Sequence, residues 1–284
     1  MGAWNAVDRA LRPGWGIRRA IRVSTAPARM LPTCVIIGAQ KCGTTSLHAY
    51  LDEHPDIGGS QTKEVRYFDQ PDGAHSVLWY RAHFPLRGRF RFAIESSPYY
   101  LFHPRAPQRM SALIPDAKLI ALLRDPVARA YSHYHHARAH GRETLPFAEA
   151  LEIEQAQLPA EHERLERDPT ANSRIHRRYS YVSRGLYAPQ IQRWYDYFGR
   201  EQLLILESER LFEDPAGTLT QVQEWLGVRP HRPRNLRPHN TRDYDAIDPP
   251  FAAQLRERFA ADRTELESLT GMTFRWPRSE VPAA

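Results

Sequence analysis

The sequence predicts an α/β fold in which helices flank a doubly wound parallel sheet. Two observations lead to this prediction. Short runs of β-branched residues or leucine recur along the chain, and such runs are typical of strands buried on both faces. Each run is followed by a turn and a helical stretch, which is the alternation that parallel strands joined by crossover helices require.

The elements follow in order along the chain. Residues 34–39 read as the first strand, and a helix over 44–53 begins with Thr-Thr-Ser hydroxyls and ends at His54-Pro55. The remaining strand and helix predictions are strands over 90–95, 118–123 and 202–207 and a helix over 251–269. The charged segment 143–178 reads as a helical insertion or lid, with an ordinary pair of surface helices as the alternative.

Composition sets the broad class. The 284 residues suit one large domain, and no apolar run approaches the roughly 18 residues that a membrane span needs. We expect a basic N-terminal arm over 1–30, without the apolar core of a secretory signal, followed by a single domain over 31–284. The expected location is cytoplasmic, and the excess of arginine over lysine suggests a GC-rich bacterial genome.

Charge favours anionic partners. The chain has 39 basic and 33 acidic side chains, a net charge of +6. Only three of the basic residues are lysines, namely Lys41, Lys63 and Lys118. Because nearly all the other basic residues are arginines, the few lysines indicate positions that need a compact point charge.

The two cysteines, Cys34 and Cys42, are expected to be small buried residues in a reducing compartment.

A phosphate-binding loop is predicted between the first strand and the first helix. Gly38-Ala-Gln-Lys41-Cys-Gly43-Thr-Thr-Ser46 combines glycines, which let the backbone approach a ligand closely, with the start of a helix, whose N–H groups attract phosphate. The ATP-type pattern is absent, because Lys41 precedes the second glycine by two residues. A glycine-rich turn with an incidental lysine is the alternative.

A second phosphate contact is predicted at the end of strand 118–123. Arg124 stands there, and its forked guanidinium can bond two phosphate oxygens at once. Asp125 and Pro126 read as the cap and first turn of the next helix, and Ser132 lies two turns further on.

These motifs together resemble one family. The loop around Lys41, then Lys63-Glu64-Val-Arg-Tyr-Phe, then Leu-Arg124-Asp-Pro with Ser132, then Arg184-Gly-Leu-Tyr187, occur in the order found in sulfotransferases that use 3′-phosphoadenosine 5′-phosphosulfate (PAPS), in particular the heparan-sulfate-type branch. The resemblance covers roughly residues 32–226 and implies a P-loop-like sulfotransferase fold. It also implies transfer of a sulfuryl group to a hydroxyl, or less readily an amine, by in-line displacement.

The resemblance assigns roles to residues. Lys41 would contact the leaving oxygen, Glu64 would be the catalytic base, and Arg124 with Ser132 would grip the 3′-phosphate. Further donor contacts are expected from Gly38, Gln40, Cys42, Gly43, Thr44, Thr45, Ser46 and Tyr187. Acceptor contacts are expected from Lys63, Arg66, Glu95, Ser97 and His136, with Glu95 either facing the acceptor or architectural.

The chain departs from the family at two places. Ser96 stands where the family's Glu-Lys-Thr-Pro block has a lysine near the acceptor, which argues against an acidic glycan. The C-terminal loop that covers the nucleotide in the animal enzymes is missing, and residues 234–240 are the candidate for its replacement.

Other readings are weaker. The histidines between 133 and 140 have no carboxylate or cysteine to complete a site, so no metal is predicted. A P-loop kinase would need a hydroxyl after Lys41 to hold Mg²⁺, and Cys42 stands there. A non-catalytic binder of polyanions or nucleotides would explain the charge but not the loop or Glu64. The expected partner is a carbohydrate or small natural-product acceptor, not nucleic acid, and peripheral contact with a membrane surface stays open.

Overall fold

A five-stranded parallel sheet forms the centre of the molecule, as predicted. The computed structural model describes residues 15–237 and 244–278, and for 15–19 only the course of the backbone. The strand order is β2-β3-β1-β4-β5, and all the pairings are parallel. The strands are β1 Cys34–Gly38, β2 Ile57–Gly59, β3 Phe92–Ser96, β4 Lys118–Leu123 and β5 Leu203–Glu207.

The buried runs explain the order of the strands. Every residue of β1 is buried, and so is every residue of β4 except Lys118, so these strands lie side by side in the middle of the sheet. The sequence missed β2, because its three residues Ile-Gly-Gly carry almost no apolar signal. The other predicted strands differ from the observed ones by two residues or fewer at their ends.

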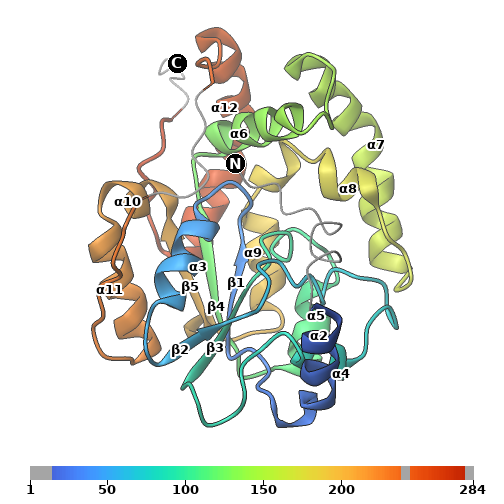
Figure 1. Cartoon of the computed structure of the whole chain (residues 1–284). Coiled ribbons are helices and arrows are strands. Elements are labelled where there is room, and N and C mark those ends of the chain that lie inside the picture. The colour runs from blue at the N-terminus through green and yellow to red at the C-terminus, as the bar shows by residue number, and fades with distance from the viewer. Residues whose placement is uncertain (1–14, 238–243, 279–284) are drawn as a thin grey trace.

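Helices cover both faces of the sheet. Figure 1 shows α3, α10 and α11 on one side and α5 and α9 on the other. The α-helices are α2 Trp15–Ser24, α3 Thr44–Asp52, α4 Val77–Arg81, α5 Ala106–Leu113, α6 Pro126–Ala139, α7 Phe147–Arg167, α8 Arg174–Arg178, α9 Ala188–Tyr195, α10 Ser208–Glu213, α11 Pro215–Leu226 and α12 Pro249–Thr270; the 3₁₀ turns are η1 Ala26–Ala28, η2 Ser183–Gly185 and η3 Arg200–Gln202. Within the described ranges, none of these helices is both long and apolar enough to cross a membrane.

The start of α6 is built as the sequence predicts. The Asp125 side chain accepts a hydrogen bond of 3.2 Å from the amide of Ala128, and Pro126 occupies the first turn. Arg124 thus stands between the carboxyl end of β4 and the capped start of α6.

Segment 143–178 is helical, in agreement with the sequence. It contains α7 and α8, and Figure 1 shows α7 at the periphery with α8 on its inner side.

Residues 20–30, in contrast, are not a detached arm. The Arg22 Nε atom donates to the carbonyl of Ala82 at 2.6 Å, and Arg29 is buried with its Nη1 atom donating to the carbonyl of Phe84 at 2.8 Å. Packing against the α4 region thus extends the folded part toward the N-terminus; residues 1–14 of the predicted arm lie outside the described residues.

Candidate active site

The predicted phosphate loop connects β1 to α3. Gly43 caps α3 with a φ of 85°, in the left-handed region, and Lys41 holds a φ of 74° there as well. Non-glycine residues in this region are uncommon and cluster at functional sites. Packing requires a glycine at position 38, because a Cβ atom there would lie 2.4 Å from the Cβ atom of Leu101. The loop therefore turns tightly and leaves the amide groups at the start of α3 available to an anion.

Arg124 lies directly against this loop. Its Nη1 atom donates to the carbonyl oxygen of Lys41 at 3.3 Å, across 83 positions of sequence. The Tyr187 hydroxyl donates to the carbonyl of Arg124 at 3.0 Å, and its ring is fully buried. Tyr187 was expected to contact the donor; this geometry favours a supporting role in which it holds the backbone of Arg124.

Two further arginines are buried behind the loop. Arg129 is fully buried, and its Nη2 atom donates to the carbonyl of Tyr181. Among the described residues, its Nε and Nη1 atoms have no hydrogen-bond partner. Arg184 is 3% exposed, and its Nη1 atom donates to the side-chain oxygen of Gln40 in the loop. Burial lowers the pKa of Arg184 to about 9, so its guanidinium remains charged at neutral pH.

Cys42 is a buried free thiol, as is Cys34, in agreement with the sequence. Burial raises the pKa of Cys42 to about 12, so the thiol stays protonated and offers no hard ligand for Mg²⁺. Among the described residues, no group of three or more His, Cys, Asp or Glu side chains is arranged to hold a metal ion.

Glu64 lies at the same edge of the sheet. Its amide donates to the carbonyl of Ser96, the last residue of β3, at 3.0 Å, and its φ of 61° is again left-handed. Because β3 pairs with β1, this turn lies beside the strand that leads into the phosphate loop. The carboxylate is 48% exposed and forms an ion pair of 3.2 Å with Lys63. Glu64 is thus accessible to an acceptor and held beside a cation.

The predicted acceptor residues divide into two groups. Glu95 is fully buried and accepts hydrogen bonds from Tyr80, Ser97 and Tyr100, so the architectural alternative is favoured over acceptor contact. Ser97 is also buried. Its hydroxyl donates to the Glu95 carboxylate and accepts from the amide of Arg66. The hypothesis of acceptor contact is therefore not supported for these two residues.

Arg66 and His136 remain partly exposed and stay acceptor-binding predictions. Arg66 has a φ of 62° and is paired with buried Asp69, whose Oδ2 atom lies 2.9 Å from its Nε atom. His136 lies near His140 on the last turn of α6, with 4.3 Å between ring centroids.

The remaining donor residues lie in the first turn of α3 and the second turn of α6. Thr44, Ser46 and Ser132 are buried, and Thr45 is partly exposed. Residues 234–240 are described only up to Arg237. There the Tyr50 hydroxyl of α3 donates to the carbonyl of Leu236 at 3.0 Å, so this stretch begins against the helix that follows the phosphate loop. Residues 238–240 lie outside the described residues.

Sequence reasoning missed the carboxylates that support the site. Asp262 of α12 accepts hydrogen bonds from the amides of Tyr187 and Ala188, at 2.8 and 3.0 Å. Glu154 of α7 accepts from three successive amides starting at Tyr181. Each carboxylate lies on a charged amphipathic helix, at least 27 positions from its partners, so no local pattern marks it. Arg184 was also missed as a site residue, although it lies in the Arg184-Gly-Leu-Tyr187 motif. An arginine next to a glycine in that motif was the signal that could have identified it.

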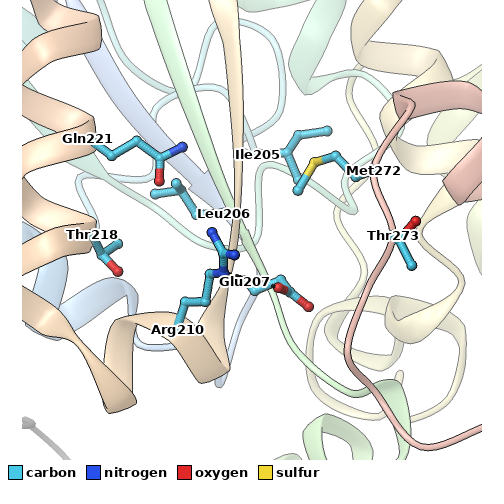
Figure 2. Close-up of a pocket in the computed structure, with 8 residues that line it drawn as sticks. All are labelled: Ile205, Leu206, Glu207, Arg210, Thr218, Gln221, Met272 and Thr273. Atoms are coloured by element: carbon cyan, nitrogen blue, oxygen red, sulfur yellow. Dashed lines mark ion pairs between the residues drawn. The ribbon is translucent and has the colours of Figure 1, made fainter.

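A pocket along β5 lies apart from these residues. Figure 2 shows it between α11, which contributes Thr218 and Gln221, and the segment with Met272 and Thr273. Its charged groups, Arg210 and Glu207, form an ion pair of 3.7 Å with each other. It contains no predicted site residue, so we place the candidate site at the phosphate loop instead.

His48 on α3 gives a testable consequence of burial beside Lys63. Burial, and then the charge of Lys63, lowers the pKa of His48 from 6.5 to about 4. The unfolded chain then binds more protons below pH 6.5, so this group removes stability as the pH falls. We expect the free energy of unfolding of His48→Leu to fall less between pH 7.5 and 5.0 than that of the wild type, by about 2 kcal/mol. Urea unfolding at both pH values measures it, and equal losses in both proteins would contradict it.

Comparison with known proteins decides the family. The sequence model described as Sulfotransferase domain matches residues 31–243. The chain belongs to the sulfotransferase family. Its parallel sheet flanked by helices is the fold of that family. A solved sulfotransferase from Alicyclobacillus acidocaldarius is 32% identical, with a TM-score of 0.70 over 86% of this chain and 97% of that one.

Curated relatives of this sulfotransferase act on heparan sulfate, according to their names. Human bifunctional heparan sulfate N-deacetylase/N-sulfotransferase 3 is 35% identical over 210 residues, which are 71% of this chain and 23% of that protein. Human heparan sulfate glucosamine 3-O-sulfotransferase 3B1 is 29% identical over 277 residues, 89% of this chain and 67% of that protein. The chain thus spans about a quarter of the length of the first relative.

Proposed function

We propose that this sulfotransferase transfers a sulfuryl group from PAPS to a hydroxyl, or less readily an amine, of a carbohydrate or small natural-product acceptor. One observation carries the proposal. The contact of Arg124 with Lys41, at 3.3 Å, joins the predicted 3′-phosphate residue to the predicted sulfate residue at the start of α3. The contact is made by the backbone carbonyl of Lys41, so it holds the guanidinium of Arg124 against the phosphate loop. A cation held there, beside a helix N-terminus, suits a ligand that carries phosphate groups at both ends.

The buried charges fit such a donor. None of the ion pairs among the described residues involves Arg129 or Arg184, although both are buried. Arg129 also keeps two unpartnered nitrogens there. The carboxylate of Glu154 acts on both only through space. Buried charge without an ion pair is costly, and a bound polyanion would compensate it. Gly43, Thr44, Thr45 and Ser46 would hold the 5′-phosphate with Lys41, while Arg124 and Ser132 would hold the 3′-phosphate.

When bound, PAPS supplies an activated sulfuryl group whose sulfur–oxygen bond to the 5′-phosphate breaks as the acceptor oxygen bonds to sulfur. Glu64 takes the proton of the acceptor, and its carboxylate is held beside Lys63 by the ion pair of 3.2 Å. Lys41 places its ammonium at the oxygen that departs with the 5′-phosphate, where negative charge grows during the reaction. Two-ended binding by Arg124 and the loop fixes the donor for in-line attack.

The surroundings of Glu64 favour an acceptor with negative charge. Burial lowers the pKa of Arg66, but the Asp69 carboxylate, with a smaller contribution from Glu64, outweighs burial, so its pKa is raised. Burial and then the charge of Arg66 lower the pKa of Arg177. The pKa of Arg178 is lowered by burial and by Arg174. The names of relatives print heparan sulfate, which is such an acceptor, whereas the serine at position 96 argues against an acidic glycan.

Calorimetric titration with 3′-phosphoadenosine 5′-phosphate (PAP), the desulfated product, tests the donor assignment. We expect micromolar affinity, much weaker binding of ADP, and a loss of about tenfold or more in Arg124→Ala, because a charge-assisted contact to the 3′-phosphate disappears. Arg167→Ala is the matched control, since Arg167 is an exposed arginine on α7 paired with Glu163 of the same helix.

Two outcomes would count against the assignment. Equal affinity for ADP and PAP would favour an ATP-type site. An equal loss of affinity in Arg124→Ala and Arg167→Ala would indicate that only overall charge matters, which is the behaviour of a polyanion binder.

A further inference from the structure

A chain of hydrogen-bonded side chains lies behind the phosphate loop and is not used in the chemistry above. The Tyr99 hydroxyl lies 2.7 Å from Nδ1 of His176, and Nε2 of His176 lies 2.8 Å from Nδ1 of His162. Beyond it, Nε2 of His162 lies 3.3 Å from the Glu166 carboxylate and 3.4 Å from Arg193. Tyr99, His176 and His162, here called the histidine chain, come from the segment after β3, from α8 and from α7.

The histidine chain supports the aromatic cradle of Arg184. The guanidinium carbon of Arg184 lies 4.7 Å from the ring centroid of Tyr99 and 5.3 Å from that of Phe102. Phe102 in turn stacks on His176, with 4.3 Å between centroids and 14° between planes. A desolvated cation is attracted to the faces of aromatic rings, so both rings help to hold the buried guanidinium.

The α8 segment also fixes the direction of Arg184 by hydrogen bonds. The Nε atom donates to the Ser180 hydroxyl at 2.7 Å, and Nη2 donates to the carbonyls of Arg177 and His176 at 2.5 and 3.3 Å. Only Nη1 points away from these acceptors, to Gln40, the neighbour of Lys41. The guanidinium of Arg184 therefore connects the α8 segment to the phosphate loop.

The surroundings require His176 to be neutral. Its ring is fully buried, and each nitrogen has one partner, which matches one donor and one acceptor of a neutral imidazole. The charged and titratable groups that face it are cations or neutral rings: Arg184, Arg193, His103 and His162. An imidazole is therefore suited here to link Tyr99 to α7 without adding charge beside Arg184.

We propose that His176 and Tyr99 are positioning residues for the donor site: they hold Arg184 against Gln40 and so couple the docking of α7 and α8 to the shape of the phosphate loop. The inference rests on the proposed function, because the ligand of the loop is taken to be the nucleotide of PAPS. Neither residue touches the reacting atoms. Their effect is expected on donor affinity and donor KM, with acceptor KM unchanged.

The test compares PAP affinity in three variants at a temperature where circular dichroism shows all of them folded. We expect His176→Ala to weaken PAP binding about tenfold and Tyr99→Phe, which keeps the ring under Arg184, about threefold. Phe84→Leu is the control for a purely structural loss, because Phe84 is fully buried in the core and packs against Tyr80, away from the loop. Its PAP affinity is expected to equal that of the wild type.

Each outcome is informative. If the wild type binds PAP and both His176→Ala and Tyr99→Phe bind it as tightly as Phe84→Leu does, the inference is overturned while the proposed function stands. If the wild type itself does not bind PAP, the proposed function fails first. Should His176→Ala not fold, Tyr99→Phe decides the question, since it removes one hydroxyl and no ring.

Discussion

Replacing Lys41 by alanine is expected to lower kcat by about 10²–10³-fold with a much smaller change in PAP affinity. The ammonium interacts with an oxygen that becomes more negative as the sulfur–oxygen bond breaks, so its contribution grows in the transition state. Lys41→Arg should recover only part of the loss, because a planar guanidinium is larger and spreads its charge. The left-handed backbone at Lys41 adds a geometric requirement, since this conformation sets where the side chain leaves the loop.

The measurement is the rate of PAP formation at saturating PAPS with an acceptor that the wild type sulfates. Lys118→Ala is the matched control. Lys118 is one of the three lysines, but its Nζ atom donates to the carbonyl of Trp225 at 2.6 Å and lies 4.5 Å from the centroid of that ring. It should lose stability and keep kcat. A Lys41→Ala enzyme with kcat within about threefold of the wild type would remove Lys41 from the chemistry.

Glu64→Gln is expected to reduce kcat/KM by about 10²–10⁴-fold, the usual contribution of a general base. The amide keeps the size of the side chain and its position after β3 but cannot accept the proton of the acceptor. PAP affinity should be unchanged, because in the proposed mechanism the carboxylate acts on the acceptor, and its ion pair is with Lys63. Steady-state kinetics with varied acceptor, together with PAP titration of the same variant, separate the two effects.

Glu95→Gln is the informative comparison for Glu64→Gln. Burial raises the pKa of Glu95, and its carboxylate accepts hydrogen bonds of 2.7 Å from both Ser97 and Tyr100. This variant should therefore lower the free energy of unfolding and leave the rate of the folded enzyme close to that of the wild type. The reverse pattern, with Glu95→Gln inactive and Glu64→Gln active, would move the base from position 64 to position 95.

Much of the fold could be predicted from the sequence because its signals are local. Buried parallel strands need continuous apolar runs, and Val35 to Ile37 and Leu119 to Leu123 supply them. Asp125 and Pro126 start α6 through contacts within one turn of that helix. Their pattern can therefore be recognised without knowing which other elements α6 packs against. β2 was not predicted, because it is a strand through its pairing with β3 and not through its own residues.

The candidate site divides in the same way. Its loops could be located because glycine, lysine and helix-start residues stand together in short stretches, and parallel strands bring their carboxyl ends to one edge. The sequence left two roles open for Glu95 and did not predict the supporting role of Tyr187, because burial depends on what the rest of the chain places over a residue.

The sequence by itself determined the α/β class, the phosphate loop and the resemblance to sulfotransferases. Only the tertiary structure decided which cations are buried and what holds them. Arg184 meets Gln40 across 144 positions, and Tyr99 meets His176 across 77. Contacts over such separations are set by how helices pack on the sheet, and the residues themselves carry no local mark of their partners.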